Sequence, residues 1–368
     1  MASSTRTVIY LSPDGPVLRD ISESYRPTGA QSLLRVDYSG INPADIKHAA
    51  IGLHSSVAGY DMSGEVLETG PDSPFQPGDR IFGLNPTGPG RPLHMGAHQD
   101  FAMASDRFWY KLPASPAAAG PRRLGPREAA TLPVMTLTAA DGLFHLLGLG
   151  FPRAGIAGSA SQGLLIWGGA STVGVAALQL AKAAGHGPIF VTASAKNHAA
   201  LAALGADRCF DYRSDDVVEQ IRKAIRDGGK PVRHALDTVG AASLAAGDEF
   251  EKSSPALAAA SIQEDQQDGP GVKLACVLPV REDPRFKLCF ATRDPDSPLP
   301  MARMADAEAW YGMQAKVMSW VVGNFGEGQY VGCPNVTVVK GAAECLEAMR
   351  RSAEGRSSLE KIVCEHPL

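Results

Sequence analysis

The stretch from Gly163 to Gly174 constrains the fold of this chain more than any other. Its first five residues, Gly-Leu-Leu-Ile-Trp, form an apolar run that predicts a buried β-strand. Glycines and small residues follow at once, and a helical pattern of apolar residues begins near Val175. A strand, a tight glycine turn and a helix, in this order, bring unpaired backbone N–H groups and the positive end of a helix dipole to one point. Such a point favours the binding of a phosphate group.

Strands and helices alternate after this turn. Further strands are predicted at 188–192, 208–212 and 233–237, and helices from about 197 and over 215–227. This alternation predicts right-handed crossovers and a parallel sheet, in which Asp237 to Gly240 is a strand end that faces a ligand crevice. We interpret residues 148–162 as a Gly-, Ala- and Ser-rich connector. Residues 241–271, which include the polar run 264–270, are interpreted as an exposed insertion.

The two ends of the chain carry a different pattern. Short strands with frequent turn signals indicate a compact β-rich module, with strands predicted at 7–11, 33–38, 64–67, 80–83 and 100–103. Helices are predicted at 126–130, 136–147 and 305–322, and strand, helix and strand at 335–339, 342–349 and 359–363. The sequence therefore predicts an α/β protein that combines a β-rich domain with a doubly wound parallel-sheet domain.

The glycine turn matches a dinucleotide-binding fingerprint with one change. The Gly-x-Gly-x-x-Gly spacing is present as Gly169-x-Ser171-x-x-Gly174, so serine replaces the middle glycine. Backbone groups of Ser171, Thr172 and Val173 are expected to meet a pyrophosphate, and the Ser171 hydroxyl is a further candidate. A purely structural glycine turn is the alternative, but the strand–helix units that follow favour nucleotide binding.

The end of the second predicted strand bears on the choice of cofactor. Folds that bind NAD usually carry an acid there, which bonds the ribose 2′-hydroxyl. This chain has Ala-Ser-Ala-Lys-Asn at 193–197, with no acid. Ser194 and Lys196 offer a hydroxyl and a cation that suit a 2′-phosphate, although a capping serine and a solvated lysine would look the same. The sequence therefore favours NADPH over NADH.

Composition excludes several classes of protein. The 368 residues carry a net charge of −4 and no basic stripe, which argues against nucleic-acid binding. No apolar run approaches the roughly 20 residues of a membrane span, and the N-terminal residues lack the apolar core of a signal peptide. The six cysteines form no Cys-x-x-Cys motif and are interpreted as thiols in a reducing compartment. We expect a cytoplasmic protein.

Several motifs in order resemble the medium-chain dehydrogenase/reductase superfamily. They are Gly40-Ile-Asn-Pro-Ala-Asp-Ile-Lys47, Gly59-Tyr-Asp-Met-Ser-Gly64, Phe75 to Gly83, Gly96 to Ala102, Ala129-Ala-Thr-Leu-Pro133 and the glycine turn. The resemblance implies a GroES-like catalytic domain over residues 1–135 and 306–368, and a Rossmann NADPH-binding domain over 136–305. It also implies that Tyr212 lies near the adenosine phosphate.

The positions of the zinc ligands differ from those of zinc members of the superfamily. Those members carry a catalytic Cys where this chain has Asn42, and a His-Glu pair where it has Tyr60-Asp61. Their structural zinc lobe has four closely spaced cysteines, and residues 84–100 contain none. Thiolate and imidazole are the ligands that zinc prefers. We therefore predict no metal, and a reductase of activated double bonds or quinones.

Among zinc-free members, the chain looks most like the stand-alone, trans-acting enoyl reductases of fungal polyketide biosynthesis. The motifs are those around Asn42 and Thr138, with Phe210-Asp-Tyr-Arg213 and His234-Ala-Leu-Asp237. The resemblance places Lys47 and Thr138 near the nicotinamide and substrate. With Tyr60, a candidate proton donor, they are the predicted catalytic residues. A surface lysine, a core tyrosine and a backbone-bonded threonine remain the alternatives.

The expected function is NADPH-dependent reduction of an α,β-unsaturated thioester, in trans with a polyketide synthase that carries the substrate. One alternative is a general NADPH quinone or enone reductase that acts on free small molecules. Another, of a different class, is a cofactor-binding protein with a partner role or a non-redox role. Quinone reductases of the superfamily often dimerise through the edge of the Rossmann sheet. The polar segment 241–271 precedes the strand that would pair there, so we expect a monomer.

Overall fold

A computed structural model describes residues 5–105, 107–113, 124–151, 162–262, 271–295, 297, 299–326 and 328–368. The chain forms two compact units. Unit 1 consists of Met1–Val134, Asp294–Ala305 and Val321–Leu368, and unit 2 of Met135–Arg293 and Asp306–Trp320. The domain bounds expected from the sequence, 1–135 with 306–368 and 136–305, stay a prediction.

Unit 1 is built on two sheets. The smaller one has the order β2-β1-β4, from Gly15–Ile21, Arg6–Ser12 and Ser56–Val57. The larger one has the order β15-β16-β3-β5-β6-β8, with β7 paired to β3. Its strands are Asn335–Lys340, Glu360–Glu365, Ser32–Gly40, Asp61–Thr69, Arg80–Leu84, Trp109–Lys111 and, for β7, Phe101–Ala104. The short helices are α1 (Ala44–Lys47), η1 (His48–Ile51), η2 (Leu93–Met95), α2 (Pro126–Ala129) and η5 (Pro300–Ala302).

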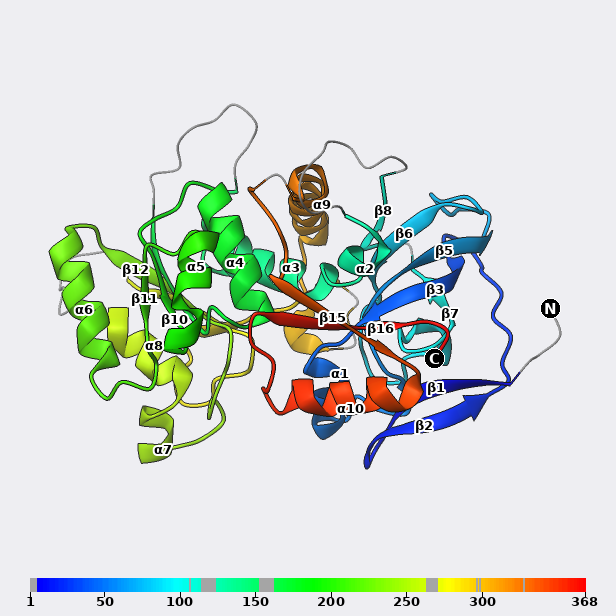
Figure 1. Ribbon diagram of the computed structural model, residues 1–368, viewed down its shortest axis with the longest axis horizontal. Helices are drawn as coiled ribbons and strands as arrows, with labels where there is room; N and C mark the ends of the chain where they lie inside the picture. The colour runs from blue at the N-terminus through cyan, green and yellow to red at the C-terminus, as the bar shows by residue number, and fades with distance from the viewer. Residues whose placement is uncertain are drawn as a thin grey trace. The chain divides into compact units, whose positions relative to one another are not determined.

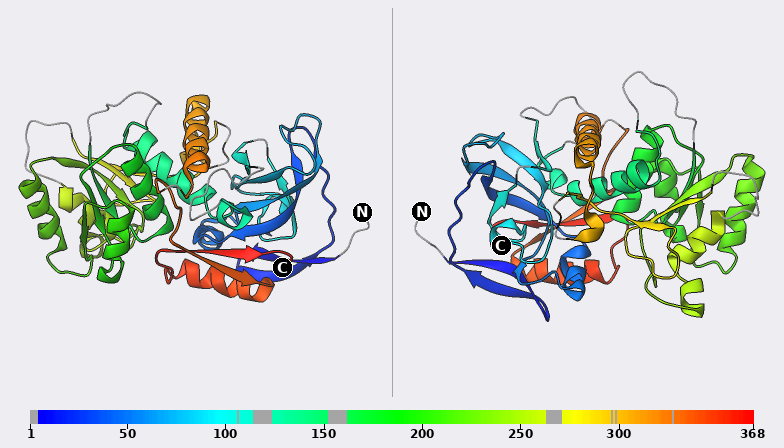
Figure 2. Two further views of the ribbon diagram at one scale, coloured as in Figure 1. Left: turned by 45° about the horizontal axis from the view of Figure 1, so that its top comes forward. Right: turned by 180° about the vertical axis from the view of Figure 1, so that it is seen from behind.

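The end of the chain completes the sheet that the beginning starts. Strand β16 pairs antiparallel with β3, and Val363 lies opposite Gly40. Helix α10 (Ala342–Ala353) joins β15 to β16 and packs against α1 and β1 through Cys345, Ala348 and Met349. Figures 1 and 2 show these red and orange segments beside the blue N-terminal strands. The two ends of the sequence therefore share one core.

Unit 2 contains the predicted parallel sheet, with the order β11-β10-β9-β12-β13-β14. Its strands are Arg208–Phe210, Ile189–Thr192, Gly163–Trp167, Val232–Asp237, Lys273–Cys276 and Phe286–Leu288, and every adjacent pair is parallel. The helices are α3 (Pro133–Ala140), the π-helical turn η3 (Asp141–Leu146), α4 (Thr172–Ala183), η4 (Ala195–Asn197), α5 (His198–Leu204), α6 (Val217–Gly228), α7 (Asp248–Glu251), α8 (Ser254–Ile262) and α9 (Ala307–Asn324), which runs on into unit 1. The predicted α/β class is confirmed.

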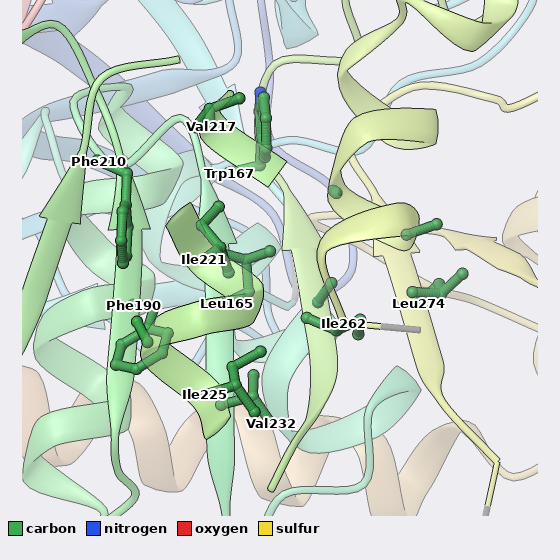
Figure 3. Packing of buried hydrophobic residues seen from close by; sticks show 14 of the residues in the cluster. Leu165, Trp167, Phe190, Phe210, Val217, Ile221, Ile225, Val232, Ile262 and Leu274 are labelled. Carbon is green, nitrogen blue, oxygen red and sulfur yellow. The ribbon is translucent and has the colours of Figure 1, made fainter. Parts of the chain in front are cut away.

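The apolar run of β9 is buried on both sides of the sheet. Leu165 and Trp167 pack against helices α6 and α8 in one cluster with Phe190, Ile221 and Ile262 (Figure 3). Leu164 and Ile166, which alternate with them and therefore point to the other face, are also fully buried. A central parallel strand with both faces covered needs such an uninterrupted run of apolar residues.

The segment 241–271 is not wholly an exposed insertion, and that prediction was wrong for its middle part. Helix α8 spans Ser254–Ile262, and Ala258, Ala259 and Ile262 join the buried cluster against the sheet. The helix is rich in alanine and serine and has no strongly polar face, so its sequence gave no amphipathic signal. Residues 263–270, which include the whole predicted polar run, and 152–161 of the predicted connector lie outside the described residues.

Over the described ranges, no helix has both the length and the apolar character that crossing a membrane would require. All six cysteines are free, and only Cys209 is not buried.

A buried ion pair fixes three segments of unit 2. The Arg293 guanidinium donates to both oxygens of Asp141, at 2.7 and 2.9 Å, and the side chains are 7% and 0% exposed. The Asp141 carboxylate also accepts hydrogen bonds from the Phe290 backbone N–H and the Trp310 indole, at 2.9 and 3.0 Å. Asp141 thereby joins η3 to the irregular segment that follows β14 and to α9.

We expect Arg293→Leu to lower the free energy of unfolding by about 3–5 kcal/mol, because it leaves the Asp141 charge buried without a cation. The matched control is Arg226→Leu on α6, which breaks an exposed pair with Glu219 and should leave stability nearly unchanged. Urea unfolding followed by circular dichroism measures both. Equal effects of the two variants would contradict a supporting role for the buried pair.

Candidate functional site

The glycine turn of unit 2 joins β9 to α4 by close backbone contacts. Gly168 has a φ of +87°, which glycine adopts without strain. A Cβ at Gly174 would lie 2.5 Å from the Gly168 carbonyl oxygen, and one at Gly169 would lie 2.0 Å from a methyl of Val191. Both glycines are therefore required by packing, the first between helix and turn and the second against strand β10.

Ser171 closes this turn as the N-cap of α4. Its hydroxyl oxygen accepts a hydrogen bond from the Gly174 N–H and donates one to the Thr238 hydroxyl, each at 2.9 Å. Thr238 follows β12 and lies 2.9 and 2.8 Å from the carbonyl oxygens of Trp167 and Gly168. The Ser171 hydroxyl proton is thus already engaged, which argues against the predicted bond from this hydroxyl to a phosphate. The sequence placed Thr238 at a strand end that faces a ligand crevice, but it did not predict this contact with Ser171.

The first turn of α4 still offers an anion site. Within the described part of the chain, the backbone N–H groups of Thr172 and Val173 have no hydrogen-bond partner, while the N–H of Ser171 bonds to the Gly168 oxygen at 3.0 Å. Free N–H groups at the start of a twelve-residue helix carry the partial positive charge that attracts phosphate.

Ser194, Lys196 and Tyr212 lie at the same edge of the sheet as the turn. Strands β10 and β11 are parallel neighbours, with Thr192 opposite Phe210, so the residues that follow each strand emerge together. Lys196 and Tyr212 are exposed and Ser194 is partly exposed. The Arg213 guanidinium lies over the Tyr212 ring, 5.0 Å from its centre.

One acid also stands at this edge. The Asp211 carboxylate accepts hydrogen bonds from the backbone N–H groups of Arg213 and Ala195, at 3.0 and 3.4 Å. The bond from Arg213 is the main cause that lowers the pKa of Asp211. Sequence reasoning noted the absence of an acid after β10 but not this acid after β11.

Unit 1 holds a buried polar cluster around Asp61. The ammonium of Lys361 donates to the Asn42 side-chain oxygen at 2.6 Å and to Asp61 at 3.0 Å. The Asn42 amide donates to the same Asp61 oxygen at 3.0 Å, and the Val134 N–H donates to the other at 2.8 Å. Burial raises the pKa of Asp61, while the Lys361 charge and these hydrogen bonds act in the opposite direction.

Tyr60 belongs to a second cluster in unit 1. Its phenol oxygen lies 2.6 Å from Nδ1 of His48 and 3.3 Å from the Thr87 hydroxyl. The Arg91 guanidinium lies over the Tyr60 ring, 4.8 Å from its centre, and bonds to the backbone carbonyls of Val57 and Gly59. Burial raises the pKa of Tyr60 and lowers the pKa of His48.

The two other predicted catalytic residues belong to different units of the chain. Lys47, at the end of α1, is exposed and directly precedes His48 in the chain. Thr138 is on α3, in unit 2, and its side chain is 8% exposed. Neither side chain has a hydrogen-bond partner within the described residues, so the alternative of a backbone-bonded threonine is not what the structure shows.

His48, His54, His94 and His98 have no Cys or His-Glu partners at ligand spacing, so the sequence predicts surface or pocket residues, and this prediction is wrong for His98. Its ring is fully buried and lies 3.2 Å from the Asp45 carboxylate and 2.9 Å from the Ser39 hydroxyl. Ser39 in turn lies 2.8 Å from the ring of His366. A histidine beside polar residues in a loop gives no sequence signal that separates such a buried network from the surface.

Two stretches of the chain match known families. Residues 28–114, in unit 1, match the family described as "Alcohol dehydrogenase GroES-like domain". Residues 172–250, in unit 2, match the family described as "Zinc-binding dehydrogenase".

Curated relatives include two fungal proteins. The dehydrogenase pigH of Monascus ruber is 38% identical over 176 residues, which are 46% of this chain and 45% of that protein. The trans-enoyl reductase fsa3 of Fusarium sp. (strain FN080326) is 31% identical over 251 residues, 65% of each chain. The matches thus span from under half to just under two thirds of these relatives.

Solved structures match over almost the whole chain. The CurK enoyl reductase has a TM-score of 0.68 at 20% identity and covers 99% of each chain. Mycobacterial Rv1454c, solved in complex with NADPH, has a TM-score of 0.66 at 20% identity and covers 99% of this chain and 100% of its own. They confirm the predicted combination of a GroES-like domain and a Rossmann domain. The predicted resemblance to the medium-chain dehydrogenase/reductase superfamily, and within it to trans-enoyl reductases, is confirmed.

The residues at the zinc-ligand positions do not fit zinc. Asn42 offers an amide, Tyr60 a phenol bonded to histidine, and Asp61 a carboxylate already paired with a buried ammonium. Across the described ranges, no three His, Cys, Asp or Glu side chains are grouped as metal ligands would be. Zinc binding would require the Lys361 charge to leave, because a dication and an ammonium repel each other.

We expect Lys361→Met to lower the free energy of unfolding by about 3–5 kcal/mol, because the buried Asp61 charge loses its cation. Adding Asp61→Asn to that variant should recover much of the loss, since a neutral amide leaves no unpaired charge. Denaturant unfolding measures both variants.

Purified wild-type protein should hold no stoichiometric zinc and should unfold at the same point after prolonged chelation. Zinc at one equivalent, or no recovery in the double variant, would contradict this account.

Proposed function

We propose that this protein is an NADPH-dependent enoyl reductase that delivers hydride to the β-carbon of an α,β-unsaturated thioester. The observation that carries the proposal is the cluster of Asn42, Asp61 and Lys361, where a buried ammonium takes the place of a metal ligand set. Reduction of a ketone or oxidation of an alcohol in this superfamily relies on a Lewis acid. An enoyl thioester is already activated by its carbonyl group and does not need one. The similarity to fungal trans-enoyl reductases supports the same class of substrate.

The residues of the sheet edge in unit 2 fit a phosphorylated dinucleotide. The free N–H groups of Thr172 and Val173, beside Gly169, Ser171 and Gly174, would hold the pyrophosphate. Ser194, Lys196 and Tyr212 would hold the adenosine 2′-phosphate, with Arg213 as a second cation. When bound, the reduced nicotinamide supplies the hydride. The NADPH complex of a structural neighbour supports this choice of cofactor.

Two further side chains are proposed to act on the substrate. Negative charge develops on the thioester carbonyl oxygen as hydride adds, and a positioned donor lowers the barrier. Lys47 carries an exposed ammonium, and the Thr138 hydroxyl has no partner among the described residues. Either can donate to an oxygen of the substrate or the cofactor. Tyr60 is the third proposed catalytic residue, as a proton source.

The partner and the location that we propose follow from the relatives. Proteins named trans-enoyl reductases act on a chain that another enzyme carries, so we propose a polyketide synthase as partner and a cytoplasmic location. We also propose a monomer. The edge strand β14 (Phe286–Leu288) has only three residues, which offers little backbone for pairing with a second sheet.

NADPH consumption with a panel of acceptors tests the function. The panel contains one enoyl group as an N-acetylcysteamine thioester and on a carrier protein, together with a free enone and a quinone. We expect both thioesters to be reduced, with the higher kcat/KM for the carrier-bound form. Reduction of the quinone alone would favour the general quinone reductase. NADPH that binds but is consumed with no acceptor would favour a non-redox role.

We expect Lys196→Ala to raise the KM for NADPH about tenfold and the KM for NADH far less. The reason is that the variant loses a charge-assisted bond to the 2′-phosphate, worth about 1.5–3 kcal/mol. Initial rates with each cofactor measure the effect. The control is Lys223→Ala on α6, another exposed lysine of unit 2, which should change neither value. Equal increases for the two cofactors in Lys196→Ala would contradict the 2′-phosphate assignment.

A further inference from the structure

We propose that Tyr60 is the general acid that protonates the α-carbon of the substrate, and that His48 is a positioning residue that returns the proton to Tyr60. This proposal rests on the proposed enoyl reduction and deepens it. The sequence named Tyr60 only as one of several proton sources, and it assigned no role to His48, Thr87 or Arg91.

The contacts place the phenol oxygen of Tyr60 among hydrogen-bonding groups. His48 Nδ1 lies 2.6 Å away and the Thr87 hydroxyl 3.3 Å away. The imidazole of His48 stands edge-on to the phenol ring, with 5.5 Å between the ring centres. Tyr60 is 7% exposed, whereas His48 is only partly buried. His48 can therefore exchange protons with water, and Tyr60 can receive them through it.

Arg91 supplies a charge that suits this role. Its guanidinium lies over the Tyr60 ring and bonds only to the carbonyl oxygens of Val57 and Gly59, and it has no carboxylate partner within the described residues. A cation over an aromatic ring is attracted by its face, and more strongly once the ring carries negative charge. Arg91 therefore favours the phenolate that forms when Tyr60 gives up its proton.

The charged groups around the pair are few. Asp45 acts electrostatically on His48 and Tyr60, but one of its oxygens is already bonded to His98 and to the Asn42 N–H. Burial lowers the pKa of His48, and the charge of Arg91 acts in the same direction. Burial also raises the pKa of Tyr60. At neutral pH the pair is thus a protonated phenol beside a neutral imidazole, which is the state that the reaction needs.

The proton balance follows from this state. Hydride forms the new C–H bond at the β-carbon, and the electron pair of the double bond moves to the α-carbon and the carbonyl oxygen. The O–H bond of Tyr60 then breaks, and its proton forms the C–H bond at the α-carbon. The Nδ1–H of His48 passes a proton to the phenolate, while Nε2 takes one from water. His48 ends neutral but protonated at Nε2 in place of Nδ1, exchange with water restores the Nδ1–H form, and the net proton has come from solvent.

The experiment compares three variants in D₂O with an unbranched enoyl thioester. Tyr60→Phe removes the acid, His48→Leu removes the relay, and His48→Asn keeps a hydrogen-bonding group close to the place of Nδ1. The matched control is Tyr110→Phe on β8, a mostly buried tyrosine of the same unit. The readouts are kcat, KM, the stereochemistry of deuterium at the α-carbon, and the ¹⁵N shifts of His48 in cofactor-free protein.

We expect wild-type protein and the Tyr110→Phe variant to give a single α-deuterated epimer. Tyr60→Phe should lower kcat about a hundredfold, the usual scale for loss of a general acid, with KM changed little and both epimers formed. His48→Leu and His48→Asn should each lower kcat about tenfold, because an amide can keep the hydrogen bond to Tyr60 but cannot relay a proton. The ¹⁵N shifts should show His48 protonated at Nδ1, with that shift moving in Tyr60→Phe.

The outcomes separate this proposal from the proposed function. Wild-type protein that reduces no enoyl thioester would overturn both. Active wild-type protein with Tyr60→Phe within threefold of its kcat, and still one epimer, would overturn the role of Tyr60 alone. A His48→Asn variant with the kcat of wild-type protein, or a His48 protonated only at Nε2, would overturn the relay.

Discussion

The structure of unit 2 depends on the close approach of helix α4 to the turn after strand β9. Any side chain at Gly174 would meet the Gly168 carbonyl, and any side chain at Gly169 would meet Val191. Thr238, from the end of the neighbouring strand β12, bonds to Ser171 and to the turn and so holds the loop in place. Because the helix starts there, the N–H groups that we propose for the pyrophosphate are left without internal partners.

Unit 1 is constrained in a different way, because the charge of Asp61 is buried and must be compensated. Lys361 and Asn42 compensate it, and Asn42 stands where zinc members of the superfamily carry a catalytic cysteine. An internal ammonium supplies a fixed positive charge, but unlike a metal it offers no open coordination position to a substrate. Charge is thus balanced within the protein, and hydrogen bonding to the substrate falls to other side chains. This arrangement suits a substrate whose double bond is activated by its own carbonyl group.

The parallel sheet could be predicted because strand and helix periodicities alternate clearly from Gly163 to Asp237. Helix α8 could not, since a helix rich in Ala and Ser shows no amphipathic period. In the site, the glycine turn and the residues Ser194 and Lys196 follow from spacing alone. The pairing of His48 with Tyr60 does not, because they are twelve positions apart and the chain between them includes the irregular segment after η1.

The sequence by itself determined the resemblance to the superfamily, the alternation of strands and helices from Gly163 to Asp237 and the glycine turn, since each of these is encoded by local spacing and period. Only the tertiary structure decided which polar side chains are paired. Lys361 and Asn42 are 319 residues apart, and their contact depends on β16 joining the sheet of β3. The cost of burying a charge without a partner is set by the folded environment. For that reason the partners of Asp61, Tyr60 and Ser171 become visible only when the chain has folded.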